Sequence, residues 1–135
     1  MTGGVTAIPG SHRDLLEAQV GILGTVGPDG RPQLSAVWFL AEGDTVSISL
    51  NTRRQKAKNL QARPVADLLV LDLSNPYRYL ELRGEADLVP DDDGAFARRV
   101  GAKYGADLSE HDAPGDRRVV VTLRPSRVNA VDMTG

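Results

Sequence analysis

A chain of 135 residues, with 41% hydrophobic and 25% charged residues, has the size and composition of one globular domain, so we expect residues 1–135 to form a single unit. The sequence has no cysteine, which excludes disulfides, thiolate metal sites and thiol nucleophiles. Its formal net charge of −2 argues against a surface made for nucleic acid, so we expect no such partner.

The hydropathy pattern bears on the compartment. No apolar run approaches the roughly 20 residues that a membrane helix needs. The first ten residues also lack the basic and apolar regions of a signal peptide. We therefore expect a cytoplasmic protein without a membrane partner.

The first half of the chain predicts one short helix and three strands. Residues 11–20 begin with a capping serine and suit a short helix. Residues 21–26 and 33–40 suit strands, and Gly27-Pro28-Asp29-Gly30 between them has the chemistry of a tight turn, which predicts a β-hairpin. A third strand is predicted over residues 45–50.

Two of these strands alternate in character, as strand side chains point to opposite faces. In residues 33–40 one face carries Gln33, Ser35, Val37 and Phe39, and the other carries Leu34, Ala36, Trp38 and Leu40. In residues 45–50 the apolar side chains are expected to point inward, which leaves Ser47 and Ser49 on the other face.

The second half predicts two helices and four strands. The helices are expected over residues 53–62 and 92–104, and the strands over 65–71, 79–89, 118–123 and 126–133. The strand 65–71 is nearly all apolar, which is typical of a strand covered on both faces. The total of about seven strands and three helices, mostly in hairpin order, predicts a mainly β fold: an antiparallel barrel or curled sheet with peripheral helices.

Several common sites have no counterpart in this sequence. The two histidines, His12 and His111, lack the spacing of a metal or nucleophile motif. The glycines between residues 24 and 30 are not followed by a phosphate-loop lysine and helix, so they are interpreted as turn residues. The acids at 91–93 fit a helix cap. We expect no metal site, and no catalytic residue is identified.

The segment after the third strand has an unusual charge pattern. Residues 53–58 hold four cations and no acid. Thr52 and Gln55 fit a capping box, which would place Arg53 and Arg54 in the first helical turn. Cations there oppose the helix dipole, whereas a bound anion would reverse the sign of that interaction. We therefore favour an anion site over the alternative of a solvated basic face.

The neighbouring strands complete this hypothesis. Trp38 is the only tryptophan and lies in the strand before the serine-lined one. A strand edge with backbone donors, a polar face and a basic helix start together suit a planar heterocycle with a phosphate tail. The sequence thus favours a nucleotide-like cofactor.

A series of motifs resembles a known family. They are the turn Pro28-Asp29-Gly30-Arg31-Pro32, the strands over 34–39 and 46–49, the helix Arg53-x-x-Lys56-x-x-Asn59-Leu60 and the late strand over 117–121. In this order they resemble the split-barrel flavin-binding family of pyridoxamine 5'-phosphate oxidase-like proteins, over about residues 15–131. The chain is most similar to the small actinobacterial branch that binds the deazaflavin coenzyme F420 and reduces substrates with it.

The resemblance implies an antiparallel split β-barrel of the FMN-binding type and a homodimer with cofactor sites at the subunit interface. It implies hydride transfer from reduced coenzyme F420 to a small organic substrate. The residues that it would place around the phosphate are Thr52, Arg53, Arg54, Lys56, Ala57 and Asn59, with Lys58 toward the anionic tail. The ring would be flanked by Ser35, Val37, Trp38, Ser47 and Ser49, and approached from the partner subunit by Tyr77, Arg78 and Tyr79.

The chain also departs from the family's pattern. Pyridoxamine phosphate oxidases proper have an Arg-x-His near the C-terminus, where this chain has Arg127-Val128-Asn129, so the oxidase activity itself is not implied. Two alternatives remain: an FMN-dependent oxidoreductase of the same fold, and a non-catalytic cofactor-binding protein. Lys58 and Arg63 favour the longer anionic tail of coenzyme F420. The substrate is not indicated, and a proton could come from water, Tyr77 or Tyr79.

Overall fold

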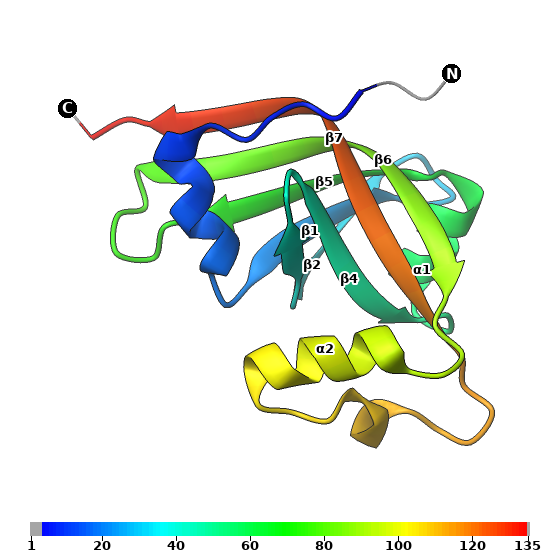
Figure 1. Cartoon of the computed structure of the whole chain (residues 1–135). Coiled ribbons are helices and arrows are strands. Elements are labelled where there is room, and N and C mark those ends of the chain that lie inside the picture. Colours follow the sequence, from blue (N-terminus) through cyan, green and yellow to red (C-terminus); the bar gives the residue numbers. More distant parts are fainter. Residues whose placement is uncertain (1–3, 135) are drawn as a thin grey trace.

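The computed structural model describes residues 4–134 (Figure 1). Its strands are β1 (Gly21–Val26), β2 (Pro32–Val37), β3 (Leu40–Glu42), β4 (Thr45–Asn51), β5 (Val65–Leu71), β6 (Arg78–Pro90) and β7 (Arg118–Asp132). Two α-helices, α1 (Gln55–Ala62) and α2 (Ala95–Tyr104), and two 3-10 helices, η1 (Gly10–Glu17) and η2 (Leu108–His111), accompany them. The termini at 1–3 and 135, which the single-domain prediction also covers, lie outside the described residues.

All seven strands belong to one antiparallel sheet with the order β2-β1-β5-β6-β7-β4-β3. Figure 1 shows this sheet curled upon itself, with α2 below the ends of β4 and β7 and with η1 and α1 at opposite sides of the view. The architecture confirms the mainly β, antiparallel split-barrel prediction.

The concave side of the sheet encloses the main core. The alternation predicted for β4 is confirmed, since Val46, Ile48 and Leu50 are buried. The inward residues of β6 behave alike, with Leu80 and Leu82 fully buried. Burial of one face of each strand is what the two-residue period of the sequence encodes.

The strand expected over 33–40 ends early. β2 stops at Val37, Trp38 and Phe39 leave the ladder, and β3 begins at Leu40. This break turns the chain from one free edge of the sheet to the other, because β2 and β3 lie at the two ends of the strand order.

The last two predicted strands form a single strand, β7. Its pairing with β6 shifts register between Arg83 and Gly84, because Arg83 lies opposite Arg127 and Gly84 opposite Pro125, with Ser126 as the extra residue. A Cβ on Gly84 would lie 2.0 Å from the carbonyl oxygen of Arg124, so only glycine allows this close approach. The break expected between residues 123 and 126 is therefore an irregularity within one continuous strand.

The prediction that β5 is covered on both faces is wrong for the single chain. Ala66, Leu68 and Val70 are buried, but Val65 is 45% exposed and the strand's other outward residues are only partly covered. One face of β5 therefore stays open in this protomer.

The start of α1 also differs from the expected capping box. The helix begins at Gln55 with Arg54 as N-cap, and no side chain caps it. Thr52 takes no part in a box, because the Gln55 amide donates to Asn59 Oδ1 at 2.8 Å. Asn51 Oδ1 instead accepts the backbone N–H of Arg53 at 3.0 Å. Arg53 and Arg54 thus precede the helix.

The acids before α2 do cap their helix, as expected. The Asp91 carboxylate accepts the backbone N–H groups of Phe96 and Ala97 at 3.1 and 3.0 Å. Asp93 accepts that of Ala95 at 3.0 Å. None of the helices within residues 4–134 has the length and apolar character required to cross a membrane.

Candidate functional site

The candidate site lies where α1 meets β2, the strand at one free edge of the sheet. This place, between Lys56 and Ser35, is called the barrel opening below. Within residues 4–134, β2 is paired only with β1, and the short β3 covers only residues 45–47 of β4. The end of β4 and the outer edge of β2 therefore have free backbone edges. α1 follows β4, and its Lys56 ammonium donates to Ser35 Oγ on β2 at 3.3 Å. Lys56 thus links the helix to the strand across the opening.

The environment of Lys56 is unusual for a charged group. The residue is only 9% exposed, and within the described chain its ammonium forms no ion pair with a carboxylate, only the bond to the Ser35 hydroxyl. Burial and the neighbouring Arg54 guanidinium lower the pKa of Lys56 from its ordinary value of 10.5. A buried cation without a counter-ion is costly, and an anionic ligand would supply one.

Three further cations surround this lysine in the sequence. Arg54 and Lys58 are exposed. The Arg53 side chain is 69% exposed and forms an ion pair with Asp116 Oδ1 at 3.2 Å. Thr52, which precedes them, is held through its backbone N–H by the carbonyl of Arg117 at 2.9 Å. The basic segment is therefore both accessible and anchored.

Two other predicted residues on α1 have a structural role. Asn59 is 1% exposed and donates to Thr25 Oγ1 and Gln33 Oε1 at 3.1 and 3.2 Å. Ala57 is fully buried in the main core. These residues fix α1 against β1 and β2, and so position Lys56 rather than offer a surface to a ligand.

The serine face of β4 is not open, contrary to what the sequence indicated. Ser47 is 8% exposed and shares a hydrogen bond with Thr122 Oγ1 at 2.9 Å. Ser49 accepts from the Arg118 guanidinium at 3.2 Å. A second apolar cluster centred on α2 and η2 covers this side of the sheet. The structure thus does not bring these serines together with Ser35 and Lys56.

Trp38 and Val37 have different surroundings although they are adjacent. Val37 is 6% exposed and belongs to the main core. Trp38 is 37% exposed, and its ring stacks on Tyr104 of α2 with centroids 4.4 Å apart and planes inclined by 5°. Of the two, Trp38 presents a surface for a ligand.

The group at residues 77–79 lies at the other end of the sheet, beside η1 (Figure 1). Arg78 is bound within its own chain, by ion pairs to Asp14 and Asp72. Tyr77 is 61% exposed, whereas Tyr79 is half-buried. These residues do not reach the Lys56 opening of the same protomer.

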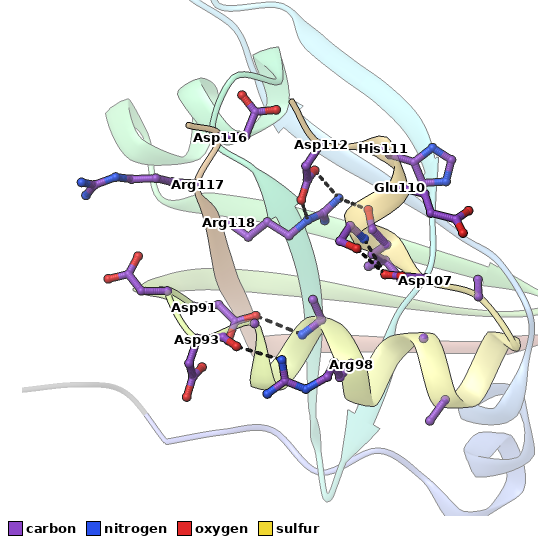
Figure 2. Close-up of a pocket in the computed structure, with 18 of the residues that line it drawn as sticks. Asp91, Asp93, Arg98, Asp107, Glu110, His111, Asp112, Asp116, Arg117 and Arg118 are labelled. Atoms are coloured by element: carbon purple, nitrogen blue, oxygen red, sulfur yellow. Dashed lines mark hydrogen bonds and ion pairs between the residues drawn. The ribbon is translucent and has the colours of Figure 1, made fainter. Parts of the chain in front are cut away.

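A hollow with a volume of about 1460 Å³ lies elsewhere, between α2, η2 and the loop before β7. Figure 2 shows the Arg118 guanidinium pointing toward Asp112 and Arg117 pointing away from it. Arg118 bonds Asp112 at 2.7 and 2.8 Å, and this lowers the pKa of Asp112. The charges of Arg118 and Asp112, at the centre of this hollow, therefore neutralise each other. Among residues 4–134, no group of side chains has the composition of a metal site.

Several residues of this region were missed by sequence analysis. Asn51 donates to Asp112 Oδ1 at 3.0 Å and to Asp116 Oδ2 at 2.8 Å, while it also accepts from the Arg53 backbone. Asn51, Asp112 and Asp116 thus hold the basic segment from a loop about 60 residues away in sequence. In the sequence, only the acidic composition of that loop indicated that it could contact the basic segment.

Comparisons with known proteins identify the family and the fold of this chain. The family model described as pyridoxamine 5'-phosphate oxidase matches residues 8–132. A solved structure of an F420 reductase is similar at 40% identity, covering 90% of this chain and 98% of that one, with a TM-score of 0.81. A conserved hypothetical protein from Mycobacterium tuberculosis shares the fold at 23% identity, with 98% and 89% coverage and a TM-score of 0.75.

A Listeria innocua protein described as a pyridoxamine 5'-phosphate oxidase shares the fold at 24% identity, with 89% and 94% coverage and a TM-score of 0.68. The family match spans nearly the whole chain, including the barrel opening and the Lys56 helix. The chain therefore belongs to the pyridoxamine 5'-phosphate oxidase family of split-barrel proteins.

Proposed function

We propose that this protein is a coenzyme F420-dependent oxidoreductase that binds the coenzyme's phosphate at the barrel opening and reduces a small organic substrate. The observation that carries the proposal is the buried Lys56 ammonium, whose described partner is the Ser35 hydroxyl and not a carboxylate. When bound, the deazaflavin would supply the hydride, while the protein supplies position and electrostatics.

The residues fit a phosphate group. Lys56 would donate a charge-assisted hydrogen bond, and the Ser35 hydroxyl can donate a second one from the facing strand. Arg54 adds positive potential, since its charge already acts on Lys56. Arg53 would join them after leaving Asp116. In this arrangement the cations that precede α1 serve the ligand and not the helix.

The choice of coenzyme F420 over FMN rests on two supports. One is the similarity at 40% identity to an F420 reductase. The other is the exposed Lys58, which lies beyond the phosphate-binding residues and suits further negative charges on a longer tail. Arg63 is a weaker candidate than the sequence indicated, because its guanidinium donates to the Val26 carbonyl at 3.0 Å.

A spectroscopic titration tests the proposal. Apo protein is titrated with coenzyme F420 and with FMN at low and high salt. We expect tighter binding of coenzyme F420 at low salt, with a preference that shrinks as salt rises and in Lys58→Met, because exposed pairs are screened. Tighter binding of FMN at every salt concentration would replace this proposal with the FMN-dependent alternative. Coenzyme binding without turnover of any tested substrate would favour the non-catalytic one.

We also propose a homodimer, joined through the open face of β5. A hollow of about 790 Å³ on this face is lined by apolar side chains that include Leu34 and Val65, which are 68% and 45% exposed. Asp67 and Arg83 pair on the same face at 3.3 Å, and burial raises the pKa of Asp67. Exposed apolar residues around a neutralised charge pair suit contact with a second copy.

In such a dimer, Tyr77 and Tyr79 are the residues proposed to approach a partner's site, whereas Arg78 is retained by its own chain. Sedimentation equilibrium tests the assembly, with Leu34→Glu as the disrupting variant and Leu73→Glu, at another exposed leucine, as its control. We expect a wild-type dimer that only Leu34→Glu dissociates. A wild-type monomer that binds coenzyme stoichiometrically would refute the dimer.

A further inference from the structure

The joint between β2 and β3 is held by side chains and not by a strand partner. Trp38 and Phe39 lie outside both strands, so the polar backbone groups of Phe39 need other partners. The Tyr104 hydroxyl is a partner for both the N–H and the carbonyl of Phe39. It accepts the Phe39 N–H at 3.1 Å and donates to the Phe39 carbonyl at 3.2 Å.

Lys103 adds a second support from the same turn of α2. Its ammonium donates to the Phe39 carbonyl at 2.8 Å and to the Ala18 carbonyl at 3.3 Å. It also lies 4.3 Å from the centroid of the Phe39 ring, a distance typical of a cation–π contact. The end of α2 is thereby tied to the joint and to the segment that follows η1.

Tyr104 also contacts the neighbouring Trp38. Its ring is parallel to Tyr104, with centroids 4.4 Å apart, so one indole face is covered while the residue remains 37% exposed. Trp38 directly follows β2, the strand whose Ser35 meets Lys56. The partly exposed indole thus lies three residues along the chain from the hydroxyl that Lys56 bonds.

We propose that Tyr104 and Lys103 are positioning residues of the cofactor site, which hold Trp38 as an aromatic wall on which a planar ring stacks. The inference rests on the proposed function, since it assumes a cofactor with its phosphate at Lys56. An aromatic stack depends on ring orientation. A tryptophan that is free to rotate would have to be ordered when the ligand binds, which weakens affinity.

Two substitutions separate the hydrogen bonds of Tyr104 from its ring stack on Trp38. Tyr104→Phe keeps the aromatic ring but removes both hydrogen bonds to the Phe39 backbone. Tyr104→Leu removes the ring stack as well. The matched control is Arg98→Ala on the first turns of the same helix, where the exposed guanidinium donates to the Asp93 carbonyl at 2.9 Å.

The readouts use the single tryptophan of the chain. Trp38 fluorescence reports its environment without ligand, and its quenching on titration with coenzyme F420 or FMN gives the dissociation constant. We expect a shifted emission and about threefold to tenfold weaker binding in Tyr104→Phe, with a larger loss in Tyr104→Leu. Arg98→Ala should match the wild type. Inorganic phosphate, as a competitor for Lys56, should bind all four proteins equally.

The outcomes distinguish this inference from the proposed function. If the wild type binds a cofactor and both Tyr104 variants bind it with unchanged affinity, the positioning role is refuted while the proposed function stands. If the wild type binds neither cofactor, the proposed function fails and this inference fails with it. If Tyr104→Leu does not fold, as judged by circular dichroism, Tyr104→Phe alone decides.

Discussion

Arg53 and Arg54, which begin the basic segment at residues 53–58, lie between two charged regions that are organised in opposite ways. On the side of the loop before β7, Arg118 bonds Asp112 and Ser49, and Asp116 bonds Asn51 and Arg53. On the side of α1, the Lys56 ammonium meets, among residues 4–134, only the hydroxyl of Ser35. The first region neutralises its own charges, whereas the second leaves a buried cation without a counter-ion.

The difference teaches that hollow size and binding capacity are separate properties. The large hollow beside α2 has its central arginine and acids tied to one another, which stabilises the loop but leaves little for a ligand to gain. The site at Lys56 keeps an unfavourable charge burial that a ligand can relieve. Groups arranged for binding often cost stability in the free protein.

The largest expected effect is a loss of stability in the self-neutralised region. Arg118→Ala leaves Asp112 without its bidentate partner, and the Arg118 side chain is only 13% exposed. We expect a decrease of about 2–4 kcal/mol in the free energy of unfolding, measured by urea denaturation. Arg98→Ala, on the exposed side of the same hollow, serves as the control. A loss in Arg118→Ala below about 0.5 kcal/mol would contradict the structural role.

The second effect is a loss of binding in the region without a counter-ion. Lys56→Met removes the buried cation but keeps the aliphatic length, so we expect about 10- to 100-fold weaker binding of coenzyme F420, measured by titration. The unfolding temperature of the free protein should stay equal or rise, because a desolvated charge is lost. Arg31→Gln, at an exposed hairpin cation, controls for net charge. Unchanged affinity in Lys56→Met would refute the phosphate site.

A smaller change, an increase in coenzyme affinity, is expected where the two regions meet. Asp116 Oδ2 accepts from Asn51 and from the Ala113 backbone at 2.8 Å each, while Oδ1 pairs with Arg53. In Asp116→Asn the amide oxygen can keep both hydrogen bonds while the ion pair is lost. Freed Arg53 should then bind the coenzyme about two- to fivefold more tightly. Asp44→Asn, in a remote ion pair with Arg13, is the control. Weaker binding in Asp116→Asn would contradict a ligand role for Arg53.

The smallest effect is a pH dependence of stability. Burial lowers the pKa of Lys56 below 10.5, so between the folded pKa and 10.5 the unfolded chain binds more protons. The contribution of Lys56 to the free energy of unfolding therefore rises with pH between its folded pKa and 10.5. The stability difference between Lys56→Met and the wild type should shrink as pH approaches 10.5, as measured by denaturation at several pH values. A difference that stays constant with pH would argue that Lys56 is not desolvated.

Much of the fold could be predicted from local patterns. Alternation placed β4 and β6 within about a residue of their bounds, because a strand with one buried face imposes a two-residue period. The bounds of β1 and β5 were predicted from residue type and from a continuous apolar run. The concentration of cations at residues 53–58 also indicated the candidate site, since charge density is a property of composition. The predicted capping box failed because Gln55 bonds Asn59 and the Asn51 side chain holds Arg53.

The sequence by itself determined the strands, their inward faces and the basic segment, since these depend on neighbouring residues. Only the tertiary structure decided which of these residues can act together. It buried Lys56 against Ser35, covered Ser47 and Ser49 with α2, and placed Tyr104 under Trp38. The Lys56–Ser35 hydrogen bond joins residues 21 positions apart, and the bond between Tyr104 and Phe39, next to Trp38, joins residues 65 positions apart. Whether a charge is exposed or desolvated depends on such distant neighbours, which no local pattern encodes.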